Sequence, residues 1–169
     1  NGTVRRVVKP LRRWGIPVRP LSKTYADRVL VAGDAAGFAK PTTGGGIYYA
    51  LLSGEMAAET AHEAFMEGDL SARRLKGYQR RWKAMFGKEL RTGYYARVLF
   101  EALGDRQIER LLRLCVEAQE EIIGAREFSF DWHGKVILKA LRRGDLAKLF
   151  TSVGPAVVPA LSRLVRARL

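Results

Sequence analysis

An aspartate among glycines and other small residues is the first feature of this chain that could bind a cofactor. Residues 28–47 read RVLVAGDAAGFAKPTTGGGI. Asp34 directly follows an apolar run, and a carboxylate at the end of a buried strand can accept hydrogen bonds from sugar or ribityl hydroxyls. Gly33 and Ala35 add no bulk beside it, so a cofactor could lie close to the backbone. The pattern predicts one side of a cofactor site.

A second loop supplies a different kind of group. Gly44, Gly45 and Gly46 stand just before Ile47, where we expect a long helix to begin. The first N–H groups of a helix have no partner within the helix, and the helix dipole adds partial positive charge there. Such a corner favours an anionic or electron-rich oxygen. A reduced flavin, whose negative charge gathers at its pyrimidine end, is a natural occupant of such a corner.

The order of these pieces resembles a family of flavoproteins. The pieces are residues 33–38 (GDAAGF), Pro41, residues 43–47 (TGGGI) and residues 48–50 (YYA). Together they are similar to the second flavin-contacting motif of the p-hydroxybenzoate-hydroxylase-like fold, and within that fold they most resemble the geranylgeranyl reductase family. Residues 15–18 and 24–27 are also similar to what precedes the motif there. The likeness covers about residues 14–66.

The resemblance implies an FAD-dependent oxidoreductase that saturates carbon–carbon double bonds of a geranylgeranyl chain on a diphosphate, a lipid or a pigment precursor. NADPH or reduced ferredoxin would supply the electrons. The residues implied to bind FAD are Gly33, Asp34, Ala35, Pro41, Thr43, Gly44, Gly45, Gly46 and Ile47. Tyr48 and Tyr49 are the candidates for contact with the substrate. No side chain stands out as the proton donor.

One motif of the family is absent from the chain. Such enzymes begin with a strand, a GxGxxG turn and a helix that hold the ADP half of FAD, and no GxGxxG occurs here. We therefore expect the carboxyl-terminal portion of a longer protein, inactive without its amino-terminal part. The expected fold is mixed α/β, with a few amino-terminal strands of a Rossmann-like flavoprotein fold followed by a largely helical region. Residues 1–67 would complete the FAD-binding domain, and residues 68–169 would form a helical region with a basic amphipathic tail.

Hydrophobic periodicity and turn residues predict the individual elements. Strands are expected at residues 3–8, 16–18 and 29–32, the last of them buried, and helices at residues 47–67, 71–90, 92–103, 105–121 and 132–143. Ser71 is the expected N-cap of the second helix. Tyr78, Trp82 and Phe86 recur four residues apart, which predicts one core-facing stripe. Cys115 lies in an apolar stripe and is expected to be a small buried hydrophobe.

The charge balance indicates anionic partners. The 169 residues carry a net charge of +13, with a pI near 10.4. Nucleic acid, phospholipid head groups and a diphosphate-bearing substrate all fit such an excess. The densest basic run contains Arg73, Arg74, Lys76, Arg80, Arg81, Lys83, Lys88 and Arg91, with Glu89 as its only acid. Residues 153–169 could lie on an anionic bilayer or dock onto the parent protein.

Several function classes find little or no support in the sequence. His62 and His133 are the only histidines and lack a ligand-spaced partner, so a metal site is not expected. No Gly-x-Ser-x-Gly elbow and no P-loop occur. Nucleic acid is not expected as a partner, because no binding module accompanies the charge. The single cysteine excludes an internal disulfide, and no apolar run is long enough to span a bilayer. We expect a cytoplasmic protein, peripheral at an anionic membrane surface.

Two alternatives to the reductase remain open. The same fold and Gly-Asp motif also serve FAD-dependent aromatic hydroxylases and other monooxygenases. In a different class, the chain would be a non-catalytic basic module for an anionic partner, and its glycine loop would be an ordinary turn.

Overall fold

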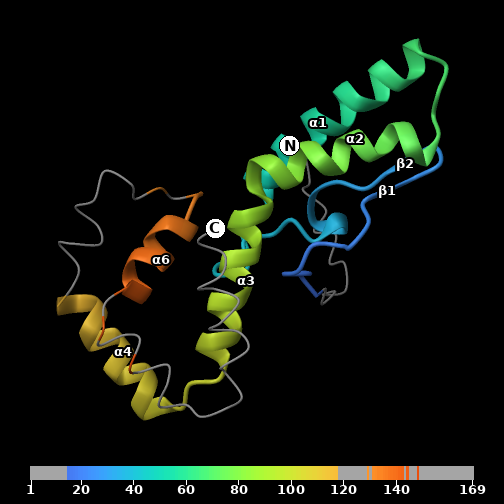
Figure 1. The fold of residues 1–169 in the computed structure, drawn as a ribbon. Coiled ribbons are helices and arrows are strands. Elements are labelled where there is room, and N and C mark those ends of the chain that lie inside the picture. The colour runs from blue at the N-terminus through green and yellow to red at the C-terminus, as the bar shows by residue number, and fades with distance from the viewer. Residues whose placement is uncertain (1–14, 118–128, 130, 143, 145–147, 149–169) are drawn as a thin grey trace, which may run out of the picture.

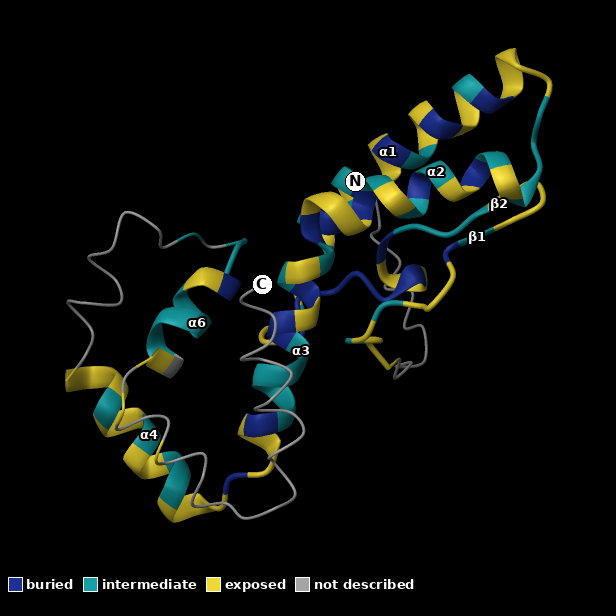
Figure 2. Ribbon diagram, viewed as in Figure 1, coloured by how far each residue is buried: buried dark blue, intermediate teal, exposed yellow. Residues whose placement is uncertain are grey.

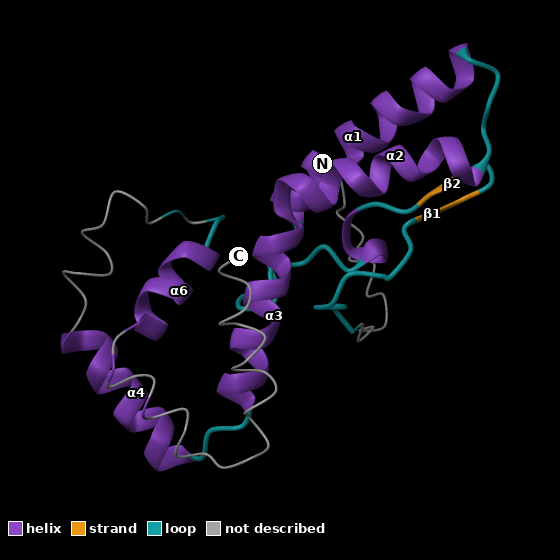
Figure 3. Ribbon diagram, in the orientation of Figure 1, coloured by secondary structure: helices purple, strands orange, loops and turns teal. Residues whose placement is uncertain are grey.

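The computed structural model describes residues 15–117, 129, 131–142, 144 and 148. Their elements are β1 (Tyr25–Ala26), β2 (Val29–Leu30), the 3₁₀ turn η1 (Gly33–Ala36), α1 (Ile47–Met66), α2 (Ala72–Trp82), the π-helical turn η2 (Lys83–Gly87), α3 (Lys88–Glu101), α4 (Asp105–Glu117) and α6 (Gly134–Arg142). This part of the chain is mostly helical (Figure 3). The β-hairpin packs against α2, which pairs with α1, and α6 packs against α3 (Figure 1).

The two short strands form an antiparallel hairpin. Tyr25 pairs with Leu30 and Ala26 with Val29. The predicted buried strand at residues 29–32 is wrong, because only its first two residues are in the ladder and Val29 is 47% exposed. A two-stranded hairpin has few neighbours, and α2 is the element that packs against it. Residues 16–18 form no strand, and residues 3–8 lie outside the described residues.

Helix α1 follows the prediction closely, and α2 begins as expected. Gly68, with φ of +67°, lies just after α1 and turns the chain back. Ser71 caps α2, since its Oγ accepts a hydrogen bond from the Arg74 N–H at 3.4 Å. The expected break near Arg91 is wrong, because the helical backbone runs from α2 through η2 into α3. No proline and no glycine of positive φ interrupts the chain there. The helical backbone instead passes through η2, which is a π-helical turn.

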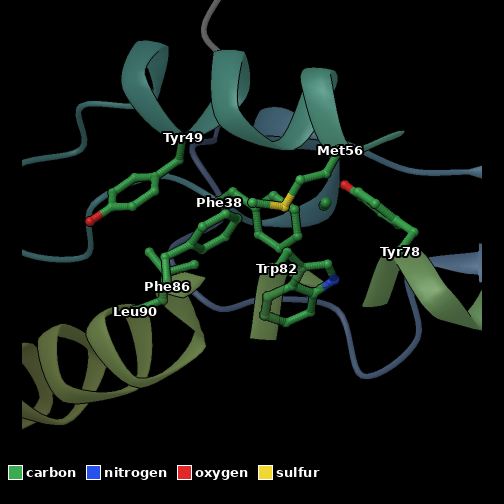
Figure 4. Packing of buried hydrophobic residues seen from close by; sticks show 8 residues of the cluster. Phe38, Tyr49, Met56, Tyr78, Trp82, Phe86 and Leu90 are labelled. Carbon is green, nitrogen blue, oxygen red and sulfur yellow. The ribbon is translucent and has the colours of Figure 1, made fainter. Parts of the chain in front are cut away.

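The core joins the GDAAGF segment to three helical elements. Phe38 is fully buried, with its ring centroid 4.7 Å from that of Trp82 and 5.2 Å from that of Phe86. Tyr49 of α1 and Tyr78 of α2 lie on either side of them (Figure 4). The predicted stripe of Tyr78, Trp82 and Phe86 is therefore confirmed as core. Burying one phenyl ring contributes about 1.5–3 kcal/mol, so Phe38 fixes the segment that carries the candidate site.

The later helices are less buried than their sequences predict. No residue of α4 is buried, and Leu112 and Val116 are 59% and 65% exposed (Figure 2). Cys115 is exposed, so the expectation of a buried thiol is wrong. Helix α6 begins two residues after the predicted start. The basic tail at residues 153–169 lies outside the described residues. Among the described helices, none combines the length and apolar character needed to cross a bilayer.

Candidate cofactor site at the glycine loop

The GDAAG segment forms a tight turn that requires its two glycines. Gly33 and Gly37 have φ of +58° and +75°, a region that favours glycine. A Cβ at Gly37 would overlap the carbonyl of Arg19, and one at Gly33 would lie 3.2 Å from the Cβ of Ala50. The Gly33 N–H donates to Ser53 Oγ on α1 at 3.0 Å. The turn is thus tied directly to the first helix.

Asp34 and Gly46, twelve positions apart, meet at the start of α1. A Cβ at Gly46 would overlap the Asp34 carboxylate, so a side chain at this position would displace the carboxylate from the start of the helix. No side chain caps α1, and the described residues offer no acceptor for the N–H groups of Gly46, Ile47 and Tyr48. Asp34 is exposed, and its negative charge lies at the positive end of the helix dipole. Carboxylate acceptor and amide donors therefore share one corner, as the sequence predicts.

Hydrogen bonds within the loop occupy part of the glycine triplet. The Gly44 N–H donates to the Lys40 carbonyl at 2.7 Å, and the Lys40 N–H donates to the Gly45 carbonyl at 2.8 Å. The Gly45 N–H has a longer contact of 3.5 Å with Thr43 Oγ1. Gly44 has φ of +76°, which this narrow loop needs. The amides open to a ligand are therefore those from Gly46 onward, and those of Gly44 and Gly45 serve the loop itself.

Helix α3 supports the loop from its other side. Pro41 is buried, and a Cβ at Gly93 would lie 3.2 Å from the Pro41 Cδ. Arg97 donates from Nη1 to the Pro41 carbonyl at 3.2 Å. Pro41 therefore fixes the loop against α3, whereas Thr43 is exposed.

A segment far along the chain, residues 131–133, also holds the loop. The Lys40 Nζ lies 2.9 Å from Asp131 Oδ1, and the lysine side chain is almost fully buried. The Tyr49 hydroxyl donates a hydrogen bond to the Asp131 carbonyl oxygen at 2.7 Å. Thr42 Oγ1 and His133 Nδ1 are 2.9 Å apart. Sequence reasoning missed these contacts, because the burial of Lys40, which calls for an acidic partner, is visible only in the structure.

Glu89 of α3 anchors that same segment. Its Oε1 accepts hydrogen bonds from the N–H groups of His133 and Gly134, at 2.6 and 2.7 Å, where α6 begins. An acidic group at a helix N-terminus is stabilised by free amides and by the dipole. The sequence identified Glu89 only as the sole acid of a basic run, and the structure shows that it caps α6.

The two tyrosines after the loop have different surroundings. Tyr49 is buried, and burial together with the charges of Glu89 and Asp131 raises the pKa of its hydroxyl. Tyr48 is half-buried, and its hydroxyl accepts a hydrogen bond from Trp132 Nε1 at 3.3 Å. The hydroxyl of Tyr49 is thus engaged within the protein, and Tyr48 is the more accessible of the pair.

An apolar pocket of about 430 Å³ lies between α3, α4 and α6, with Thr42 of the loop in its wall. Its lining includes Leu99, Phe100, Leu111 and Ile137, which are hydrophobic side chains. A pocket of this size and character suits a hydrocarbon group. Cys115 also lines it, and although this thiol is exposed, the partial desolvation by its surroundings raises its pKa.

The chain is similar to archaeal reductases. Over 98 residues it is 41% identical to digeranylgeranylglycerophospholipid reductase 2 of Methanopyrus kandleri, a match that covers 57% of this chain and 25% of that protein. Over 109 residues it is 40% identical to digeranylgeranylglycerophospholipid reductase of Methanocaldococcus jannaschii, covering 64% and 28%. The predicted likeness to the geranylgeranyl reductases is confirmed. The match lies in the carboxyl-terminal portion of these geranylgeranyl reductases, so it spans about a quarter of their length. No family model and no solved structure matches the chain.

Proposed function

We propose that the protein is an FAD-dependent reductase that saturates carbon–carbon double bonds in the geranylgeranyl chains of a lipid. The observation that carries the proposal is the corner where the Asp34 carboxylate meets the uncapped start of α1 at Gly46. The names of the relatives support reductase activity on a digeranylgeranylglycerophospholipid.

The corner fits the polar half of a flavin. The Asp34 carboxylate can accept hydrogen bonds from ribityl hydroxyls. The N–H groups of Gly46, Ile47 and Tyr48 can donate to an electron-rich carbonyl oxygen, and the helix dipole adds to this attraction. When bound and reduced, FAD would supply the hydride, and a proton would complete the saturated bond. The protein's part is to hold the acceptor and donors at fixed positions.

Supporting contacts would keep this corner rigid. The ion pair between Lys40 and Asp131 and the packing of Pro41 on α3 limit movement of the loop. Preorganised donors contribute to catalysis because they need not reorient during the reaction. We therefore propose a positioning role for Lys40, Pro41 and Asp131, while Asp34 and the amides from Gly46 onward would contact FAD.

The apolar pocket supports a long hydrocarbon substrate over a small aromatic one. Its wall includes Thr42, so it begins beside the glycine loop and extends between α3, α4 and α6. The charged side chains at its edge, Arg97 and Glu101, pair with each other at 2.7 Å. Their pairing leaves the interior largely apolar, which favours a prenyl chain.

An activity assay tests the proposal. The protein from the complete reading frame is purified, reduced with dithionite and incubated with a digeranylgeranylglycerophospholipid. Mass spectrometry should show the gain of one pair of hydrogens for each double bond saturated. Asp34→Ala should lose both bound flavin and turnover, with its fold checked by circular dichroism. The proposal would be wrong if the protein purifies with flavin, leaves the lipid unchanged and hydroxylates an aromatic compound. Such a result would indicate a monooxygenase.

A further inference from the structure

A second cavity, of about 400 Å³, lies beside the junction of α2 and α3 and is surrounded by cations. Arg19 comes from the loop before β1, and Lys83, Lys88 and Arg91 come from η2 and α3. The remaining lining residues are Pro20, Trp82, Gly87, Tyr94 and Tyr95. Among the described residues, the lining therefore holds four positive charges and no carboxylate.

Among the described residues, these four cations have no acidic partner, unlike Arg74 and Arg81 of the same basic run. Within the part of the chain that the structure describes, none of them forms a salt bridge. Arg74 and Arg81 belong to the same basic run, and both pair with Glu63 of α1. Glu89, the sole acid of that run, directs its carboxylate to the start of α6. These acidic side chains therefore pair with other groups, and they do not neutralise the positive charges around the cavity.

Aromatic side chains hold two of the cations at the cavity wall. The Arg19 Cζ lies 5.6 Å from the ring centroid of Tyr94, and the Lys83 Nζ lies 5.6 Å from that of Trp82. Stacking of this kind orients a cation without neutralising it. Four like charges around one cavity repel each other, and a multiply charged anion would relieve that repulsion. A phosphate monoester, with a charge of about −1.5 to −2 at neutral pH and three acceptor oxygens, suits the site better than a carboxylate, and a phosphodiester head group also offers a negative charge and acceptor oxygens.

We propose that this cavity binds a phosphoryl group, carried either by a free phosphate or diphosphate or by the head group of a phospholipid. The π-helical turn η2 contributes Lys83 and Gly87, and turns of this type often occur at functional sites. Gly87 lines the cavity, and a Cβ there would make only ordinary contacts, with Lys83 and Trp82 at 3.4 and 3.6 Å, so a larger side chain is needed to fill the space.

Binding of pyrophosphate and inorganic phosphate to the purified full chain tests the site by calorimetry. Lys88→Gln combined with Arg91→Gln should weaken pyrophosphate binding at least about tenfold, because two charge-assisted contacts are lost. The matched control combines Lys76→Gln with Arg80→Gln, two exposed positions of α2 outside the cavity with the same change in net charge. Gly87→Leu should weaken binding similarly by filling the cavity without changing any charge. Added salt should reduce the affinity of the unaltered protein.

Vesicles of phosphatidylcholine with and without phosphatidylglycerol distinguish the two sources of the phosphoryl group. Binding of the soluble anions that depends on Lys88 and Arg91 assigns the site to free phosphate or diphosphate. Vesicle binding with the same dependence, and no binding of soluble anions, assigns it to a lipid head group. Equal losses in the two double variants, or no binding of either probe, would overturn the proposal. Neither probe needs flavin or turnover, so its failure leaves the proposed reductase unaffected.

Discussion

At the residue scale, Gly46 is the position on which the candidate site depends most. It is the last residue before α1, and its missing side chain leaves the space that the Asp34 carboxylate occupies. Its φ of −114° is accessible to any residue, so the requirement for glycine comes from space alone. This separates Gly46 from Gly44, whose φ of +76° is itself unfavourable for a side chain.

Gly46→Ala should lower the free energy of unfolding by about 1–3 kcal/mol, because the new methyl group overlaps the Asp34 carboxylate. Adding Asp34→Ala should restore most of that loss by removing the clash. Gly54→Ala is the control: nothing lies near its Cβ, and alanine within a helix should raise stability by about 0.5–1 kcal/mol. Urea denaturation of these proteins and of Asp34→Ala alone measures the differences. Additive losses in the double variant would show that the two residues do not meet.

At the element scale, two sets of acidic side chains hold the helices together. Glu63 of α1 and Glu67, the residue that follows α1, pair with Arg74 of α2, and Glu63 also pairs with Arg81. Glu89 of α3 caps α6. The sequence contains all of these residues, but pairing between helices depends on packing that periodicity does not specify. Exposed ion pairs of the first kind contribute little each, while a cap on free amides contributes more.

The α1–α2 pairs should make stability depend on acid pH. Hydrogen bonds from Arg81 and then Arg74 lower the pKa of Glu63 below its usual 4.5, and Arg74 does the same for Glu67. A carboxyl group with a lower pKa in the folded state contributes stability above the unfolded value, and that contribution disappears as pH falls through the folded value. Thermal unfolding should therefore show stability declining below about pH 4.5, with a shallower decline in the combined Arg74→Gln and Arg81→Gln variant. Identical slopes in the two proteins would rule out these pairs as the cause.

Removing the cap of α6 should loosen that helix. Glu89→Ala leaves the N–H groups of His133 and Gly134 without their acceptor, a loss of about 1–3 kcal/mol for a charged hydrogen bond. Hydrogen exchange of the α6 amides should become at least about tenfold faster. Glu89→Gln keeps an acceptor oxygen and should have a smaller effect, and Glu55→Ala, an exposed position on α1, should have none. Unchanged exchange in Glu89→Ala would contradict the assigned role.

At the scale of the whole molecule, features that depend on neighbours in sequence were predicted better than contacts between distant segments. The cap at Ser71, the extent of α1 and the aromatic stripe depend on neighbours in sequence, and the structure confirms them. The corner of Asp34 and Gly46 was predictable because both residues belong to one motif. The contacts of Asp131 with Lys40 and Tyr49 were not, because they join segments about 80–90 positions apart without a repeating pattern.

Burial was predicted least well. Val29 and Cys115 have apolar neighbours in sequence, yet both are exposed, because the described part of the chain places little against their outer faces. Apolar character indicates what a side chain favours, and only the packed fold decides what covers it. The division between residues 67 and 68 into two domains stays a prediction.

Measurement of bound FAD tests the central claim most directly, namely that a flavin lies where the Asp34 carboxylate meets the start of α1. The protein from the complete reading frame, Gly46→Ala and the control Gly54→Ala are purified side by side, and the FAD held per polypeptide is determined by absorbance and flavin fluorescence. The account predicts bound FAD in the unaltered protein and in Gly54→Ala, and FAD affinity at least about tenfold weaker in Gly46→Ala. Equal FAD content in all three proteins, or none in any of them, would contradict it.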